Sequence, residues 1–154
     1  MYDLKIIAID HIKDQSYLTK VQDYLLRLRP YARIDIQELK AESFSVRNQD
    51  KAQQTEGQKL ITALSKYTPD QVYLLREVGQ RFDSVQFASW LQKKRDTVVL
   101  VIAGTLGFDQ GVIKKYPQSI SLSALTFPHE LARLILLEQL YRSSCINHGK
   151  AYHY

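Results

Sequence analysis

The stretch Thr97-Val-Val-Leu-Val-Ile-Ala103, followed by Gly104-Thr-Leu-Gly107, decides the fold that this sequence predicts. The apolar run has the length of a strand, and it has no polar residue after Thr97. An uninterrupted apolar run is typical of a strand buried on both faces, as in a parallel sheet. We therefore expect a strand buried on both faces that leads into a glycine-containing loop, at the edge where open α/β sheets bind ligands.

Strands and helices are expected to alternate on both sides of this run. Apolar spacing, the capping signal Asp83 with Gln86 and the breaker Pro30 set the boundaries. We expect strands at residues 4–9, 32–39, 71–75, 97–103 and 119–122, helices at residues 15–28, 51–66, 83–94, 110–115 and 128–144, and loops at residues 40–50 and 76–82. This alternation predicts an α/β fold, with a mostly parallel sheet and helices on both faces, in a single domain over residues 1–154.

The composition is that of an ordinary globular protein. Hydrophobic residues make up 45% and charged residues 24% of the 154 residues. The N-terminus lacks the features of a signal peptide, and no apolar run approaches the roughly 20 residues that span a bilayer, so we expect a cytoplasmic protein. The single cysteine, Cys145, excludes an internal disulfide, and we expect no metal site. The net charge of +5 permits a phosphate-rich partner without requiring one.

The common nucleotide-binding and hydrolase motifs are absent from the sequence. The turn after the first strand contains no glycine, and there is no P-loop and no G-x-S-x-G motif. The pair Asp10-His11 in that turn is interpreted as a loop pair without chemistry. Gly104, Gly107 and Gly111 follow the buried strand, where they either let a ligand approach the backbone or only permit a turn.

The last predicted helix is apolar on more than one side. Its apolar residues are Leu131, Leu134, Ile135, Leu136, Leu137, Leu140 and Tyr141. Such a helix is buried on two sides, either by the rest of the chain or by a second copy, and a homodimer is the simpler hypothesis. The segment 147–154 that follows is rich in aromatic and imidazole groups, which stack on bases and move protons, although a frayed tail is the alternative.

The C-terminal third resembles a known family at this point. A predicted strand leads into a serine-containing loop at Leu122–Phe127, whose end overlaps the motif Thr126-Phe127-Pro128-His129. A long helix with Glu138-x-x-Tyr141-Arg142 follows, and Tyr152-His153 stands near the end. This order and spacing resemble the C-terminal signature of the bacterial large-subunit rRNA pseudouridine N3-methyltransferases of the SPOUT superfamily. Weaker agreement upstream, at Gly79 and at Glu56-Gly57, extends the resemblance along the whole chain.

The resemblance implies a fold, a cofactor and a substrate. The fold would be a SPOUT α/β knot, a trefoil in which the C-terminal helix is threaded through a loop. The protein would be a homodimer that methylates N3 of a pseudouridine in the helix 69 stem-loop of 23S rRNA, on assembled ribosomes and without a membrane partner. The cofactor would be S-adenosylmethionine, and the positions that bind it would be Leu75, Ala103, Gly104, Leu122, Ser123, Ala124, Leu125, Thr126 and Phe127.

The resemblance also suggests catalytic residues. Tyr152 or His153 would position the base or accept its proton, and Arg142 would steady phosphate or base. His129 is interpreted as a helix-start residue with a structural hydrogen bond.

Two positions depart from the family's pattern. Ala103 replaces a glycine, which is tolerable only if its φ is negative, and Tyr154 replaces a basic residue. A methyltransferase acting on another RNA, or a non-catalytic protein of the same fold that binds ribosomes or other RNA, is the alternative.

Overall fold

The computed structural model describes residues 1–152, which build one sheet of five parallel strands. The order in the sheet is β2-β1-β4-β3-β5, and every pair of neighbours is parallel. The strands are β1 (Tyr2–Ile9), β2 (Ala32–Leu39), β3 (Val72–Arg81), β4 (Val98–Ile102) and β5 (Ser119–Ser121). The helices are α1 (Gln15–Leu28), α2 (Gln49–Leu64), α3 (Ser84–Gln92), α4 (Gln110–Lys115) and α5 (His129–Asn147), and a 3₁₀ turn (Pro69–Gln71) precedes β3. The predicted α/β class is confirmed.

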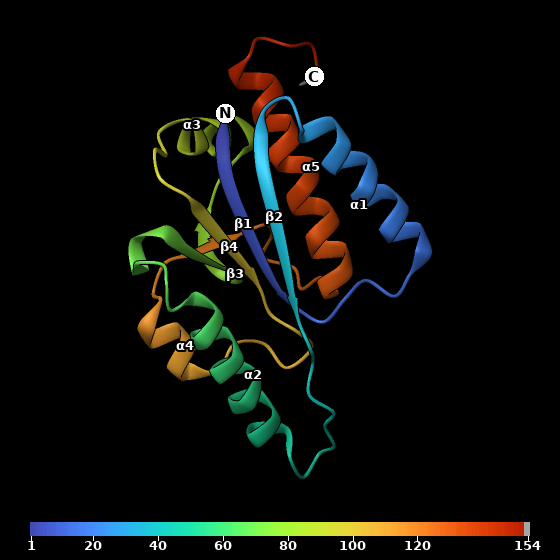
Figure 1. The fold of residues 1–154 in the computed structure, drawn as a ribbon, viewed down its shortest axis with the longest axis vertical. Coiled ribbons are helices and arrows are strands. Elements are labelled where there is room, and N and C mark those ends of the chain that lie inside the picture. The colour runs from blue at the N-terminus through green and yellow to red at the C-terminus, as the bar shows by residue number, and fades with distance from the viewer. Residues whose placement is uncertain (153–154) are drawn as a thin grey trace.

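The helices cover the sheet on both faces (Figure 1). Helices α1, α3 and α5 pack in one hydrophobic core with Leu4, Ile6 and Leu100, whereas α2 and α4 pack in a second core with Ile7 and Val101. Successive residues of a strand point to opposite faces, which is why neighbours in the sequence belong to different cores. Strand β4 lies between β1 and β3, and all five of its residues are buried. The prediction of a strand buried on both faces is confirmed.

Local sequence signals place most element boundaries. Asp14 caps α1 by accepting from the backbone of Ser16, and Asp83 and Gln86 form the predicted capping box at α3. Helix α5 begins after Pro128 and continues to Asn147, slightly beyond the expected end at residue 144. The boundaries predicted for α1, α4 and β2 agree with the structure.

The prediction of a loop at residues 76–82 was wrong. Strand β3 continues to Arg81, and its second half pairs with β5, with an irregularity between Leu75 and Gln80. Exposed residues such as Val78 (77% exposed) interrupt the apolar pattern here, so the segment does not look like a strand in the sequence. Pairing with β5, about 40 residues further along the chain, supplies the backbone hydrogen bonds instead.

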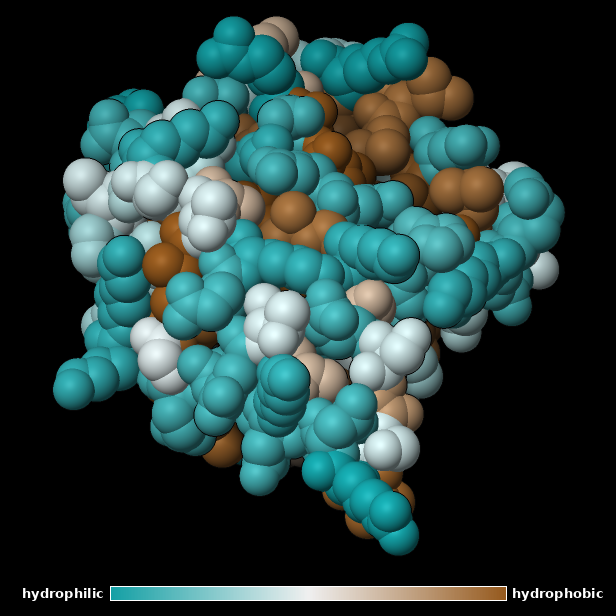
Figure 2. All heavy atoms as spheres, turned by 60° about the horizontal axis from the view of Figure 1, so that its bottom comes forward, coloured by the Kyte–Doolittle hydropathy of each residue, from teal (hydrophilic) through white to brown (hydrophobic). Residues whose placement is uncertain are grey.

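The chain itself covers much of α5, because α1 and α3 flank this helix. Leu136, Leu137 and Leu140 are fully buried, whereas Leu131 and Ile135 remain half-buried. Figure 2 turns the molecule of Figure 1 so that its bottom comes forward, and hydrophobic residues gather at the upper right, on the side on which α1 and α5 lie. The homodimer and the knot stay predictions.

Candidate functional site

A cavity of about 800 Å³ lies where the carboxyl ends of β3, β4 and β5 meet. Its walls come from the end of β3, the loop 103–108 after β4, and the segment 122–132 that joins β5 to α5. Its volume falls in the range of cavities that hold small ligands or cofactors. The edge of the sheet is also the one at which open α/β folds bind their ligands.

Eight of the nine positions predicted to bind a cofactor line this cavity. They are Leu75, Ala103, Gly104, Leu122, Ser123, Leu125, Thr126 and Phe127, whereas Ala124 is not among the lining residues. The structure thus brings three separate segments together around one cavity.

Helix α2 supports the loop after β4 through side-chain hydrogen bonds to its backbone. The side-chain amide of Gln53 donates to the carbonyl oxygen of Leu106 at 2.7 Å and to that of Phe108 at 3.3 Å. Gly107 has φ of +72°, so this position requires the conformational freedom of glycine. At Gly104 a Cβ atom would lie 2.8 Å from Cγ2 of Ile9, so close packing against β1 also requires glycine. Both glycines therefore have structural reasons, whatever the cavity binds.

The replacement of glycine by Ala103 is compatible with the backbone. Among the described residues, Asp10 is the one non-glycine residue with positive φ, so Ala103 does not adopt the conformation that would strain it. Ala103 packs against the core on the α2 and α4 side and lines the cavity.

Several residues of the cavity wall were missed by the sequence reasoning. Arg76 and Glu77 were assigned to a loop, but they lie on the extended β3 and bring one charge of each sign to the wall. Gln53 and His129 also line the cavity. Of these residues, only His129 could have been found from the sequence, because it follows Thr126-Phe127-Pro128 in the family motif. The position of Gln53 depends on how α2 packs, which no local pattern shows.

Arg142 and Tyr152, two of the predicted catalytic residues, form a cluster with Glu138 and Tyr24. The Arg142 guanidinium donates to the Glu138 carboxylate from Nη2 at 2.6 Å and from Nε at 3.0 Å. The Tyr152 hydroxyl lies 3.4 Å from Glu138 Oε1 and 3.4 Å from the Tyr24 hydroxyl. The centre of the Arg142 guanidinium lies 5.0 Å from the centroid of the Tyr152 ring. His153, the third predicted residue, lies outside the described residues.

Burial raises the pKa of the Tyr152 hydroxyl well above its ordinary value, and its hydrogen bond to Tyr24 raises it further. The hydrogen bond that Arg142 donates to the Glu138 carboxylate raises the pKa of Arg142. At neutral pH the phenol therefore keeps its proton and the guanidinium keeps its charge. This arrangement favours Tyr152 as a hydrogen-bond donor that positions a base, rather than as an acceptor of its proton.

The cluster and the cavity lie at opposite ends of α5. His129, which lines the cavity, is the first residue of α5, and Arg142 follows thirteen positions later, which is about 20 Å along a helix. Within one chain, Arg142 and the neighbouring Tyr152 are therefore too far from the cavity to act on a ligand bound there.

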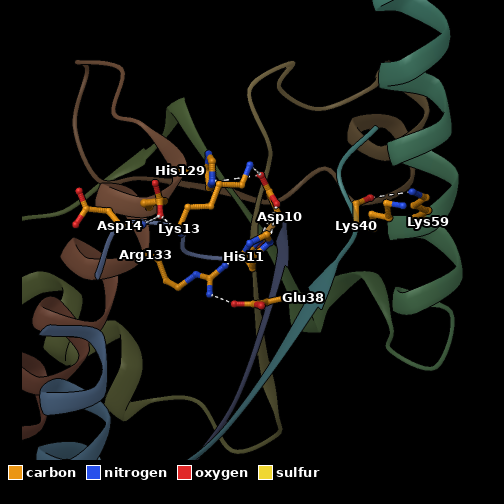
Figure 3. Close-up of polar contacts among 10 residues, drawn as sticks. Asp10, His11, Lys13, Asp14, Glu38, Lys40, Lys59, His129 and Arg133 are labelled. Atoms are coloured by element: carbon orange, nitrogen blue, oxygen red, sulfur yellow. Dashed lines mark hydrogen bonds and ion pairs between the residues drawn. The ribbon is translucent and has the colours of Figure 1, made fainter. Parts of the chain in front are cut away.

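The turn after β1 contacts the start of α5 beside the cavity, and Figure 3 shows Asp10 and Lys13 of this turn next to His129. The Asp10 carboxylate lies 2.9 Å from Lys13 Nζ and 4.0 Å from His129 Nε2. Arg133, only 2% exposed, pairs with Glu38 and donates from Nη2 to the Asp10 carbonyl oxygen at 3.0 Å. Burial acts to raise the pKa of Asp10, but hydrogen bonds from Lys13 and from the His11 backbone, together with their charges, outweigh it and leave the pKa lowered. The structural hydrogen bond expected for His129 is not found among the described residues.

Residues 1–152 contain neither a membrane-spanning helix nor a cluster of metal ligands. No helix in this range is both long enough and apolar enough to cross a membrane. Nor do three or more histidine, cysteine, aspartate or glutamate side chains gather there as metal ligands.

Comparisons with known proteins agree with this architecture. A family model described as "Predicted SPOUT methyltransferase" matches residues 2–153. Two relatives named "Ribosomal RNA large subunit methyltransferase H" are similar over 99% of both chains: one from Flavobacterium psychrophilum at 41% identity and one from Kosmotoga olearia at 35%. A proposed methyltransferase from Legionella pneumophila, solved with its cofactor SAM, has a similar fold, with a TM-score of 0.50, 13% identity and coverage of 90% of this chain and 65% of that one. From the family model and the full-length relatives together, this chain belongs to the SPOUT methyltransferase family.

Proposed function

We propose that this protein is an S-adenosylmethionine-dependent methyltransferase that modifies N3 of a pseudouridine in the helix 69 stem-loop of 23S rRNA. It would act as a homodimer on assembled ribosomes in the cytoplasm. The observation that carries the proposal is the cavity, because three segments that the family motif predicts as cofactor-binding form its walls. The names of the full-length relatives support ribosomal RNA as the substrate.

The cavity fits the cofactor in size and chemistry. Leu75 and Leu122 supply apolar surface for an adenine ring, and the loops 103–107 and 122–127 offer backbone N–H and C=O groups for its polar edge. Glu77 places a carboxylate in the wall, which suits a ligand with a positive charge. The bound cofactor would supply an activated methyl group on a sulfonium, and transfer of this group needs no metal.

The protein's own residues would align the base and manage its proton. Arg142 keeps its charge beside Glu138 and can hold a phosphate or a base. Tyr152 keeps its proton and can donate a hydrogen bond to a carbonyl of the base. His153 lies in the same terminal segment and remains proposed for the same task.

A homodimer would resolve the separation between these residues and the cavity. In a two-fold dimer that packs the α1 and α5 sides together, the start of one α5 can lie near the end of the other. The cluster of one chain would then complete the cavity of its partner. The half-buried Leu131 and Ile135 on α5 and the exposed Leu26 on α1 provide apolar surface for this contact.

The direct test combines calorimetry with methylation of ribosomes. We expect S-adenosylmethionine to bind near micromolar levels, and ribosomes from a strain that lacks its own enzyme to accept one methyl group on the helix 69 pseudouridine. Absence of cofactor binding would favour a non-catalytic RNA-binding protein. Cofactor binding with methylation of a different RNA would leave the enzyme class intact and overturn the substrate.

Mixed dimers test the shared site. One chain would carry Gly104→Val, whose side chain would collide with Ile9 and displace the loop that forms the cavity wall, and the other Arg142→Ala, which removes the guanidinium of the cluster. Each variant alone should be inactive, whereas random mixing should recover about a quarter of the wild-type activity, since half of the dimers carry one intact site. No recovery would contradict a site shared between two chains, and sedimentation as a monomer would contradict the dimer itself.

A further inference from the structure

The turn after β1 holds a residue in an uncommon backbone conformation. Asp10 has φ of +73°, a left-handed conformation that crowds its Cβ atom. Its N–H donates to the Leu39 carbonyl oxygen at 2.7 Å, and its own carbonyl oxygen accepts from the buried Arg133 at 3.0 Å. Such conformations persist only where surrounding contacts impose them, and they gather at functional sites. The backbone conformation of Asp10 therefore suggests that its carboxylate has a functional role.

The carboxylate of Asp10 faces the imidazole of His129. His129 Nε2 is enclosed and has no hydrogen-bond partner among the described residues, and Asp10 Oδ2 lies 4.0 Å away. A buried ring N–H needs an acceptor, and a shift of about 1 Å would turn this ion-pair contact into a hydrogen bond. Contacts between catalytic groups are often this long before the substrate binds. Figure 3 shows the two side chains pointing toward one another from separate elements.

The imidazole of His129 also forms part of the cavity wall. His129 lines the wall, and Nε2 is the only one of its two ring nitrogens that is enclosed without a partner. If Nε2 carries the hydrogen that points at Asp10, Nδ1 is left with a free lone pair. A cavity that would bind the methyl donor therefore has a proton acceptor in its own wall.

We propose that His129 accepts the N3 proton of the target base at Nδ1, and that Asp10 is the positioning residue that orients the ring and stabilises its charged form. This rests on the proposed function. As the N3–CH₃ bond forms and the CH₃–S bond breaks, N3 releases its proton to His129 and keeps the electron pair of the N–H bond. The positive charge of the sulfonium thus ends on the imidazolium beside Asp10, and neutral S-adenosylhomocysteine leaves. Tyr152 cannot take this role while its hydroxyl holds its own proton.

Other charged groups set the electrostatic background of the imidazole. Lys13 pairs with the same carboxylate, and Glu130 and Arg133 stand on α5 itself. Arg76 and Glu77 lie in the same cavity wall, and the charge of Asp10 contributes to raising the pKa of the buried Glu56. The variants below leave all of these groups in place.

Two variants and one control test the pair. His129→Asn removes the basic nitrogen, and Asp10→Asn removes the charge while keeping a residue that tolerates positive φ. The control is His11→Asn, because His11 contacts the same Asp10 carboxylate from the outer side, with 62% of its side chain exposed. The measurements are kcat and KM on ribosomes from pH 5 to 9, and cofactor affinity by calorimetry.

His129→Asn should lower kcat on the order of 100-fold or more with unchanged cofactor affinity. Its rate should continue to rise with pH, where the wild-type rate levels off, because only bases that have already lost the N3 proton then react. Asp10→Asn should lower kcat less than His129→Asn does. It should also move the rising limb of the kcat–pH profile toward lower pH, because the imidazolium of His129 loses its counter-charge. His11→Asn should match the wild type.

Three results would overturn the proposal. A His129→Asn variant with wild-type kcat and pH profile removes the histidine from the reaction. Loss of cofactor affinity in that variant assigns His129 to binding instead. An Asp10→Asn profile that does not move removes the positioning role. If the wild-type protein methylates no ribosomal RNA, the proposed function fails first, and this proposal fails with it.

Discussion

Gly79 on β3 lies directly against the backbone of Ile120 on β5. A Cβ atom at Gly79 would stand 2.6 Å from the carbonyl carbon and 2.7 Å from the nitrogen of Ile120. Both residues belong to strands whose pairing shifts register at this point, between Leu75 and Gln80. The contact allows β3 to continue past its irregularity, and so it places Arg76 and Glu77 in the cavity wall.

Gly79→Ala should therefore destabilise the protein. The added methyl group meets main-chain atoms that cannot rotate away, so we expect a loss on the order of 1–3 kcal/mol in the free energy of unfolding. Urea unfolding followed by circular dichroism measures it. Gly149→Asn is the control, because nothing lies within 4 Å of its added Cβ and asparagine tolerates its φ of +64°. Equal midpoints for the two variants would contradict the close approach.

Asp83→Ala should weaken the start of α3. Asp83 accepts from the Gln86 backbone at 2.7 Å, and the Gln86 side chain accepts from the Asp83 backbone at 3.0 Å. Loss of such a cap costs about 1 kcal/mol of stability. Asp83→Ser retains an acceptor at the same position and should recover most of it. If both variants unfold at the same denaturant concentration, the side-chain cap contributes nothing.

Glu56→Gln should stabilise the protein at neutral pH. Glu56 is 4% exposed, and burial raises the pKa of its carboxyl, although a hydrogen bond from the Glu42 backbone opposes the shift. Because the folded pKa lies above the unfolded one, stability falls as the pH rises from the unfolded pKa through the folded one. The variant removes this loss.

The difference between Glu56→Gln and the wild type should therefore be present at pH 7 and should disappear below about pH 4, where both states bind the proton. Thermal unfolding at the two pH values measures it. A wild-type advantage at pH 7 would mean that the ionised carboxylate has a favourable partner in the fold.

Ala103→Gly should leave cofactor binding unchanged. The backbone at Ala103 has no positive φ, so the methyl group is not strained there, and its removal relieves nothing. Glycine at this position should instead lower the free energy of unfolding by about 0.5–1 kcal/mol, because it makes the unfolded chain more flexible. Calorimetry with S-adenosylmethionine and urea unfolding together check the two expectations. Markedly tighter binding by the glycine variant would show that Ala103 crowds the ligand.

The sequence by itself determined the features that depend on neighbouring residues. The apolar run 97–103 predicts β4, because a strand between two others has both faces buried. Asp83 and Gln86 predict the start of α3, because a cap is satisfied within one turn. The family motif also located most of the cavity wall, since the loops at the carboxyl ends of parallel strands meet at one edge.

Only the tertiary structure decided which distant segments meet. The second half of β3 is a strand because β5 supplies hydrogen bonds, and neither segment shows this alone. Asp10 and His129 are 119 positions apart in the chain, and they approach each other through a turn whose positive φ no local sequence pattern predicts. The distance from Arg142 to the cavity likewise follows from α5 running away from it as one straight element. Local patterns record burial and capping, whereas the path of the chain through space decides which side chains share a site.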